Sequence, residues 1–265
     1  MPYTSLPTVR SSPMEALFIL LYRLSYSHRL KDCLKIFGCS QTRLSVIFND
    51  LVAYLISRYA EKLVWDRERL TISMLCQYAE AVKCVTGLPG IWGFVDGTMR
   101  PFCCPGEDQN VFYSGYKKTH VFKFQSIVTP DGLLSSLIGP FPGPVGDWVI
   151  WRSSGIVEIL HDLFEESGIS ETERLYVYGD SAYTPAFGVM GPFLAHVNKL
   201  LTTEEEVANI VMSGLKLGLS PIAGYYMVAT LLSNILLCIS GGNQVSEKYH
   251  LLPLTVEEYL YILNN

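Results

Sequence analysis

Two aspartates in this chain each follow a run of residues typical of a buried β-strand. Asp96 comes after 91–95 and precedes Gly97, and Asp180 comes after 175–179. If the two strands are neighbours, the carboxylates meet at one edge of the sheet, where a divalent cation such as Mg²⁺ or Mn²⁺ would hold them together. Without a metal, the two negative charges would repel each other and one pKa would rise. Taken singly, either aspartate could instead be a turn former at a strand end, which is the commoner role.

The segments around these aspartates predict a mixed sheet covered by helices. Residues 119–128 and 133–138 favour two further strands, joined within 129–132 by an Asp-Gly turn that is typical of a hairpin. Residues 139–146 are rich in Gly and Pro and predict a loop, whereas 149–164 place apolar side chains on one face of a helix. We therefore expect an α/β fold, an α+β mixed sheet with antiparallel and parallel strand pairs.

The front of the chain predicts helices over 14–25, 29–37, 41–59 and 71–85, because apolar residues recur there at helical spacing. Gly38 can end one helix in the left-handed conformation, and Ser40 can cap the next. A pair of helices joined by such a turn favours a helix-turn-helix. Its recognition helix would open with Gln41, Thr42, Arg43 and Ser45, and its core side would carry Leu44, Ile47, Phe48 and Leu51. A plain helical bundle without DNA contact fits the same pattern.

The charge distribution divides the chain in the same way. The net charge is -5, yet residues 1–70 hold 10 Lys and Arg against 6 Asp and Glu, and the remainder holds 10 against 19. A basic front and an acidic body suit a chain whose first part contacts phosphate and whose second part concentrates carboxylates. Ordinary variation in surface charge, without any contact to phosphate, would give the same counts. We expect a helical region over 1–88 and a second domain over 89–265.

Three other features favour unremarkable roles. The seven cysteines are scattered and odd in number, and no secretory signal opens the chain, so we expect reduced thiols inside a cell. The stretch 217–246 has no charged residue, but Pro, Gly and Asn interrupt it, which favours a buried helix over a membrane span. Strand alternation would separate Lys117 and Lys123 from Lys118 and His120, so we expect surface charges rather than phosphate ligands.

Several short motifs in one order carry a resemblance to a known family. They are Val95-Asp-Gly-Thr98, Tyr113-Ser-Gly-Tyr-Lys-Lys-Thr-His120, Phe122-Lys-Phe-Gln125, Pro130-Asp-Gly-Leu133, Gly139-Pro140 and Tyr178-Gly-Asp-Ser-Ala-Tyr183. Together they resemble the DDE superfamily endonucleases of the PIF/Harbinger transposase type, in particular the fungal branch. The helical front and the tail, including Tyr225-Tyr226 and Glu257-Glu-Tyr-Leu260, are similar as well, so nearly the whole chain is covered.

This resemblance implies an RNase H-like DDE nuclease core behind a helix-turn-helix region. The implied activity is cleavage and joining of DNA at transposon ends with two Mg²⁺ or Mn²⁺ ions, which generate the attacking hydroxide and stabilise the leaving oxygen. Asp96 matches the first catalytic aspartate and Asp180 the second. Asp147 lies where relatives carry a His-Asp pair after Gly-Arg-Arg, although the loop here reads Gly143-Pro-Val-Gly-Asp147, and it is a further candidate metal ligand.

One departure from the family pattern concerns the third carboxylate. After Met212-Ser213, relatives continue into a helix with a Val-Glu-Trp-Gly-Phe motif whose Glu is catalytic, whereas this chain passes directly to Gly214. Glu204, Glu205 and Glu206 are the nearest substitutes, but they suit the solvated first turn of a helix. The resemblance therefore implies a nuclear, DNA-associated protein with impaired catalysis and, as in the family, a partner DNA-binding protein. A non-catalytic DNA- or partner-binding remnant, or an inert fragment of a decayed element, is the alternative.

Overall fold

A computed structural model of the chain describes residues 11–25, 30–102, 104, 109–169, 174–192 and 223–261. The helices there are α1 (Pro13–Ser25), α2 (Leu30–Phe37), α3 (Gln41–Val64), α4 (Ile72–Thr86), α5 (Gln109–Phe112), α6 (Asp147–Ser153), α7 (Ile156–Ser167), α9 (Ala223–Ser240), α10 (Gln244–Tyr249) and α11 (Val256–Leu260). The strands are β1 (Ile91–Pro101), β2 (Tyr113–Ser114), β3 (Thr119–Val128), β4 (Leu134–Pro142), β5 (Tyr176–Tyr178) and β6 (Val189–Met190).

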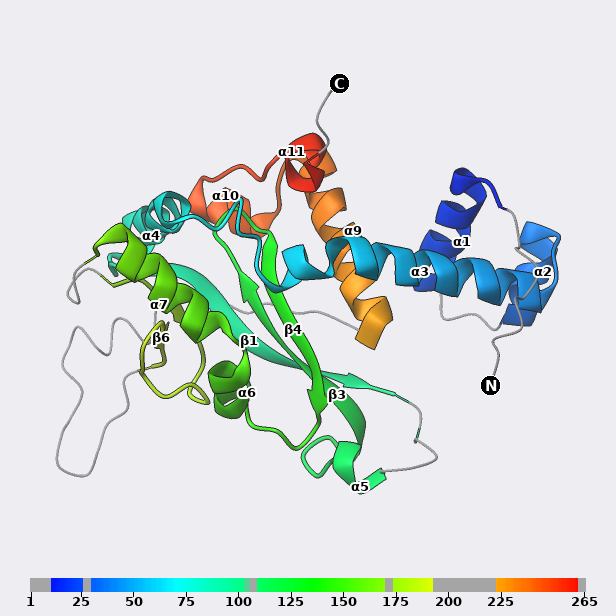
Figure 1. The fold of residues 1–265 in the computed structure, drawn as a ribbon, viewed down its shortest axis with the longest axis horizontal. Helices are drawn as coiled ribbons and strands as arrows, with labels where there is room; N and C mark the ends of the chain where they lie inside the picture. The colour runs from blue at the N-terminus through cyan, green and yellow to red at the C-terminus, as the bar shows by residue number, and fades with distance from the viewer. Residues whose placement is uncertain are drawn as a thin grey trace.

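The helical front forms where its apolar spacing predicted. Gly38, at φ 62°, makes the turn between α2 and α3, and Ser40 caps α3 because its Oγ accepts a hydrogen bond from the Arg43 backbone N–H at 3.2 Å. Leu44, Ile47 and Phe48 are buried in the cluster that joins α1, α2 and α3. These helices stand at one end of the molecule, to the side of the sheet (Figure 1).

The strands form one mixed sheet, as predicted. Its order is β2-β3-β1-β5-β6, with β4 also paired to β3. β1 runs antiparallel to β3 and parallel to β5, so it lies at the centre of the sheet. At the β3–β4 hairpin, the Gly132 N–H donates to the Thr129 carbonyl at 2.9 Å, and Gly132 has a φ of 85°. The mixed α/β architecture agrees with an RNase H-like core.

Four boundaries differ from those that the sequence predicted. β1 continues beyond Asp96 to Pro101, because β3 pairs with it as far as Pro101–Val121. β4 continues through 139–142, which we expected to be loop, because the same long β3 also pairs with Pro142. The helix expected over 149–164 is two helices, α6 and α7, since Gly155 adopts a φ of 74° between them. β5 ends at Tyr178, before Asp180.

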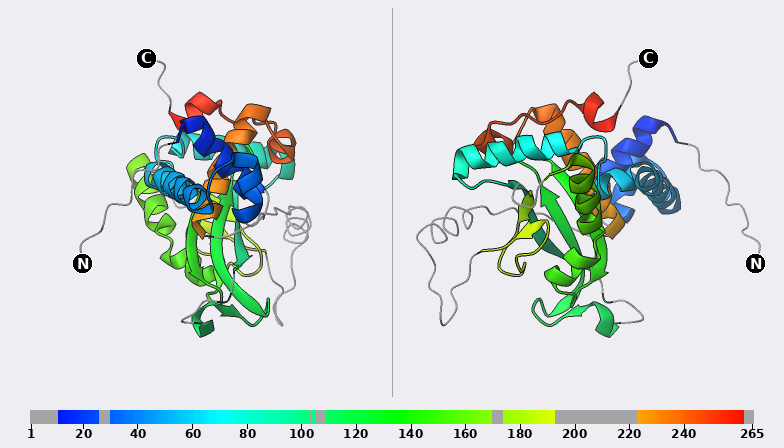
Figure 2. Two further views of the ribbon diagram at one scale, coloured as in Figure 1. Left: turned by 90° about the vertical axis from the view of Figure 1, so that its right-hand side faces the viewer. Right: turned by 60° about the vertical axis from the view of Figure 1, so that its left-hand side comes forward.

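Helices cover both faces of the sheet (Figures 1 and 2). One face packs Val95, Ile127 and Val177 against α6 and α7 and is called here the α6 face. The other packs residues such as Phe94 and Phe124 against α9 and α10 and is called the α9 face. Successive side chains of a strand point to opposite faces, so this division fixes the direction of each polar residue along β1 and β3.

Helix α9 contacts both the sheet and the helical front. Val228 is buried with the α1–α3 cluster, whereas Tyr226 is buried against Phe124 of β3, and the two views of Figure 2 show α9 beside α3. The predicted helix is therefore present, but it is buried only on one side, since Leu236 and Ile239 are 64% and 67% exposed. Within the described ranges, no helix is long and apolar enough to cross a membrane.

Candidate metal and nuclease site

Asp96 lies in the middle of β1 rather than at its end. Its neighbours Phe94 and Thr98, two residues away on either side, pair with Val128 and Phe124 of β3. Strand alternation therefore directs the Asp96 side chain toward the α9 face, together with Phe94. The residue is partly buried.

Asp180 lies beside Asp96, as the sequence predicted for neighbouring strands. Phe94 of β1 pairs with Tyr178 of the parallel β5, and each aspartate follows its paired residue by two positions. The exposed Asp180 carboxylate accepts a hydrogen bond from the Ala182 N–H at 2.9 Å, which fixes the turn after β5. The pair forms because two parallel strands place equivalent positions at the same height in the sheet.

The pKa of Asp96 reflects the nearby charge of Asp180. Burial raises the pKa of the Asp96 carboxyl, and the negative charge of Asp180 raises it further. The Gly97 backbone N–H lowers the pKa by hydrogen bonding, Asp147 raises it, and Lys123 lowers it. Two close carboxylates, one of them partly removed from water, form a site where a cation would relieve repulsion.

Asp147 is held on the opposite side of β1. Its carboxylate packs against the α-carbon of Gly97, and a Cβ added at Gly97 would lie 2.6 Å from the Asp147 Cγ. Lys123 Nζ lies 3.0 Å from both carboxylate oxygens and donates a hydrogen bond to the Val145 carbonyl at 3.1 Å. Gly97, Lys123 and Asp147 therefore belong to the α6 face, so the backbone of β1 separates Asp147 from the pair Asp96 and Asp180.

A buried hydrogen-bond chain supports this arrangement. The Gln125 side-chain amide donates to the Asp147 backbone carbonyl at 3.2 Å and to the Tyr183 hydroxyl at 3.0 Å. Tyr183 is buried, and burial together with the negative charge of Asp147 raises the pKa of its phenol. Gln125 thus connects the start of α6, which carries Asp147, to the turn after β5, which carries Asp180.

Sequence reasoning missed the placement of two residues around the site, Lys123 and Arg100. We expected Lys123 at the surface, but its side chain is only 5% exposed because the ion pair with Asp147 is folded against the sheet. Lys117 and Lys118 are exposed as predicted, although both precede β3, so strand alternation does not apply to them. Arg100 is buried on the Asp96 side of β1, with its guanidinium 4.9 Å from the ring centroid of Tyr226. Arg100 follows Asp96 by four residues in one strand, and this spacing could have placed it on the same face.

The residues predicted to contact DNA open α3. Gln41 and Thr42 are exposed, whereas Arg43 is partly buried and its Nη2 lies 3.0 Å from Glu15 Oε1 in α1. Ser45, two residues further, contacts Asn49, whose side-chain amide donates to the Ser45 carbonyl at 2.9 Å. Arg43 therefore links two helices of the front.

Glu204, Glu205 and Glu206, together with the junction at Ser213, lie outside the described residues. Over the described part of the chain, no group of three or more His, Cys, Asp or Glu is arranged to hold a metal ion. The donors present are the carboxylate of Asp96 in β1 and that of Asp180 just after β5, which are hard oxygen ligands of the kind that suit Mg²⁺ or Mn²⁺.

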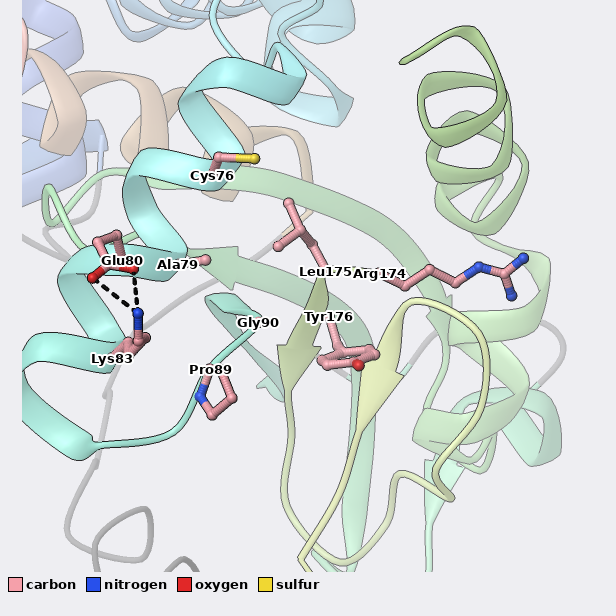
Figure 3. A pocket seen from close by; sticks show the side chains of 9 residues that line it. All are labelled: Cys76, Ala79, Glu80, Lys83, Pro89, Gly90, Arg174, Leu175 and Tyr176. Carbon is pink, nitrogen blue, oxygen red and sulfur yellow. Dashed lines mark hydrogen bonds and ion pairs between the residues drawn. The ribbon is translucent and has the colours of Figure 1, made fainter. Parts of the chain in front are cut away.

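A pocket of about 490 Å³ lies at the opposite end of the same two strands (Figure 3). Pro89 and Gly90 line it just before β1, and Arg174, Leu175 and Tyr176 line it where β5 begins. Figure 3 shows the exposed Lys83–Glu80 ion pair of α4 at its rim. Asp96 lies six residues along β1 from Gly90, about 20 Å at 3.3 Å per residue, so the pocket is separate from the carboxylate pair.

Comparison with known proteins agrees with the motifs. Residues 95–217, which include all three aspartates, match the family described as DDE superfamily endonuclease. Over 193 residues the chain is 25% identical to "Protein ALP1-like" of Arabidopsis thaliana, an alignment that covers 70% of this chain and 46% of that protein. The chain thus spans about half the length of the curated relative it matches. No solved structure matches it. The match over residues 95–217 confirms the resemblance to the DDE superfamily endonucleases that the motifs carry.

Proposed function

We propose that this chain is a transposon-derived, DNA-associated protein of the DDE nuclease type whose divalent-metal site consists of Asp96 and Asp180. The observation that supports the proposal most directly is that each aspartate follows, by two residues, one member of the Phe94–Tyr178 pair of two parallel strands, inside the matched domain. Asp147 is a weaker candidate ligand, because it lies on the other face of β1 and is paired with Lys123.

The chain's own residues fit one ion better than two. Asp96 and Asp180 supply carboxylate oxygens on the α9 face, and Lys123 neutralises Asp147 without a metal. A bound Mg²⁺ or Mn²⁺ would supply Lewis-acid activation of water and stabilisation of the leaving oxygen. In a two-metal mechanism the third carboxylate positions one of the ions, and its loss would cost several kcal/mol of transition-state stabilisation, on the order of 10³-fold in rate.

For this reason we propose impaired or absent catalysis, with DNA binding retained. The sequence passes from Ser213 directly to Gly214 without the family's Val-Glu-Trp-Gly-Phe block, and this supports the alternative of a non-catalytic DNA- or partner-binding remnant. In either case we propose that α2 and α3 contact DNA through Gln41, Thr42 and Arg43, that the protein acts in the nucleus, and that a partner DNA-binding protein assists it.

The metal site is tested by thermal unfolding of the full chain with and without 10 mM Mn²⁺, a concentration taken as roughly saturating for a weak site. A two-ligand site should add about 1 kcal/mol, which raises the melting temperature by about 2–4 °C. Asp96→Asn and Asp180→Asn should each abolish the rise, whereas Asp162→Asn, at an exposed position of α7, should keep it. A rise that survives both site variants, or no rise at all, contradicts the metal site.

Catalysis is tested on the same preparations by incubation with supercoiled plasmid and Mg²⁺ or Mn²⁺. We expect no nicking by the unmodified chain. Insertion of the family's Val-Glu-Trp-Gly-Phe block after Ser213 should restore it. Nicking by the unmodified chain that disappears in Asp180→Asn would show that the site is complete without that block.

A further inference from the structure

The turn between β2 and β3, residues 115–118, presents an unusual combination of side chains. Tyr116 is 83% exposed, more than any other aromatic residue that the structure describes. The next two residues, Lys117 and Lys118, are exposed as well, and Lys117 Nζ lies 5.2 Å from the centroid of the Tyr116 ring. One flat aromatic surface and two cations therefore share a single turn, which is called here the Tyr116 turn.

The Tyr116 turn stands on a rigid base. The buried Ser114 hydroxyl accepts a hydrogen bond from the Lys117 N–H at 3.3 Å, and Tyr113 contacts the His120 ring with centroids 5.5 Å apart. Below these residues, Phe102 stacks on Phe122 at 4.2 Å, and Phe112 meets both rings edge-on. Because packed aromatic residues already fix the base, holding Tyr116 outward against a ligand costs little further conformational entropy.

The register of the sheet sets the distance from this turn to the carboxylate pair. Ser126 of β3 pairs with Asp96, and Thr119, the first residue of β3, follows the turn directly. Seven residues of extended chain separate Ser126 from Thr119, which corresponds to about 23 Å at 3.3 Å per residue. Stacked nucleotides of one DNA strand rise about 3.4 Å each, so the turn lies about seven nucleotides from the carboxylates.

We propose that the Tyr116 turn binds unpaired nucleotides of DNA about seven nucleotides from the phosphate that faces Asp96 and Asp180. Tyr116 stacks on an exposed base, because aromatic side chains bind single-stranded bases by stacking, and Lys117 and Lys118 contact the flanking phosphates. Paired bases are stacked on each other and cannot accept the ring, so the turn distinguishes single-stranded extensions from blunt duplex. This inference rests on the proposed function, since it specifies the form of DNA that the site receives.

The test compares binding of the full chain to a blunt 20-base-pair duplex and to the same duplex with a single-stranded extension of ten nucleotides, without metal. The wild-type chain should prefer the extended DNA on the order of 10-fold, and 2-aminopurine in the extension should be quenched on binding. Tyr116→Ala should lose the preference and the quenching, whereas Tyr116→Trp should retain both. Lys117→Gln should lower the salt dependence of binding by about one phosphate contact.

Two controls are matched in exposure. Leu252 is 84% exposed between α10 and α11, and Lys248 is exposed in α10. These two helices lie at the opposite side of the molecule from α5, which directly precedes β2 (Figure 1). Leu252→Ala and Lys248→Gln should leave the preference unchanged. Equal binding of blunt and extended DNA by the wild type, or a preference that survives in Tyr116→Ala, overturns the inference while the proposed function stands. Absence of any DNA binding by the wild type overturns both.

Discussion

Gly97 allows the Asp147 carboxylate to lie directly against the backbone of β1. No side chain fits at this position, since a Cβ would overlap the carboxylate of Asp147, which Lys123 and the sheet hold in place. The glycine that follows Asp96 in the family motif therefore has a packing role here. It brings the start of α6 close to the strand that carries the candidate metal ligand.

Gly97→Ala should destabilise the protein by about 1–3 kcal/mol, the usual cost of forcing an extra methyl group into a packed site. The matched control is Gly146→Ala, one residue before Asp147, where an added Cβ meets nothing within 4 Å. Urea unfolding of both variants checks the difference. Equal stability of the two variants would show that Asp147 moves freely away from β1.

The hydroxyl of Tyr249 is buried and has no hydrogen-bond partner among the described residues. It is 3% exposed, and its ring stacks on Phe94 with centroids 5.7 Å apart. Burial raises the pKa of its phenol to about 12, from an ordinary value of 10.0. Between these two values the unfolded chain loses this proton and the folded chain keeps it, so the free energy of unfolding falls as the pH rises through that range.

Tyr249→Phe should therefore be within about 1 kcal/mol of the wild type at pH 7, since removal of an unpaired buried hydroxyl costs little. Above pH 10 the variant should become progressively more stable than the wild type. Chemical unfolding at pH 7, 10 and 11.5 measures the difference, with Tyr54→Phe, at an exposed position of α3, as the control. A difference that does not change with pH would mean that Tyr249 ionises equally in both states.

At the scale of elements, α9 is tied to the sheet by a polar side chain in an apolar helix. The buried Asn234 accepts a hydrogen bond from the Leu134 N–H at 3.0 Å and donates to the Leu134 carbonyl at 2.9 Å. Its amide also donates to the Tyr259 hydroxyl of α11 at 2.8 Å. The Asn234 side chain thus bonds to both backbone groups of Leu134, where β4 begins, and also connects α9 to α11.

Asn234→Leu should cost about 2–4 kcal/mol, because it leaves a buried N–H and a buried carbonyl of β4 without partners, each worth about 1–3 kcal/mol. Ser233→Ala, at the exposed neighbouring position of the same helix, should change stability by less than about 0.5 kcal/mol. Hydrogen exchange should show faster loss of protection at the Leu134 amide in the Asn234 variant alone. Unaltered protection there would exclude this bond as an anchor of α9.

At the scale of the whole molecule, a buried polar cluster joins the helical front to the sheet. Arg69, in the connection between α3 and α4, lies 3.4 Å from Asp131 Oδ2 in the β3–β4 hairpin and donates to the Tyr78 hydroxyl at 3.0 Å. The Thr129 hydroxyl donates to Asp131 Oδ1 at 2.6 Å. The hairpin turn and the helices of the front are therefore fixed to each other by one carboxylate and one guanidinium.

Arg69→Met should destabilise the protein by about 3–5 kcal/mol, because Asp131 remains buried without its cation. Arg67→Met, two residues earlier at an exposed position, should have little effect. Calorimetry is expected to show one cooperative transition for the wild type and for Arg67→Met, at similar temperatures. A melting temperature for Arg69→Met that equals that of Arg67→Met would disprove the role of the cluster.

Much of the local structure could be predicted from the sequence because it depends on neighbouring residues. Ser40 caps α3, Gly38 and Gly87 end helices in the left-handed conformation, and the Asp131-Gly132 turn closes a hairpin. Each of these features needs only a few adjacent side chains and the backbone conformations that they favour. The meeting of Asp96 with Asp180 needed more than local patterns, because it was expected only if the two segments were neighbouring strands, and the structure shows β1 and β5 as parallel neighbours.

The sequence by itself determined most of the helices and strands, the family motifs and the two candidate carboxylates. Only the tertiary structure decided that β1 extends past Asp96, that Lys123 is buried, and that Asp147 lies on the opposite face. These outcomes depend on contacts between segments far apart in the chain: β3 lengthens β1 by pairing with it, and α6 brings a carboxylate to Lys123. Local patterns fix which side chains alternate along a strand, but packing of distant helices fixes which face is buried and which charges meet.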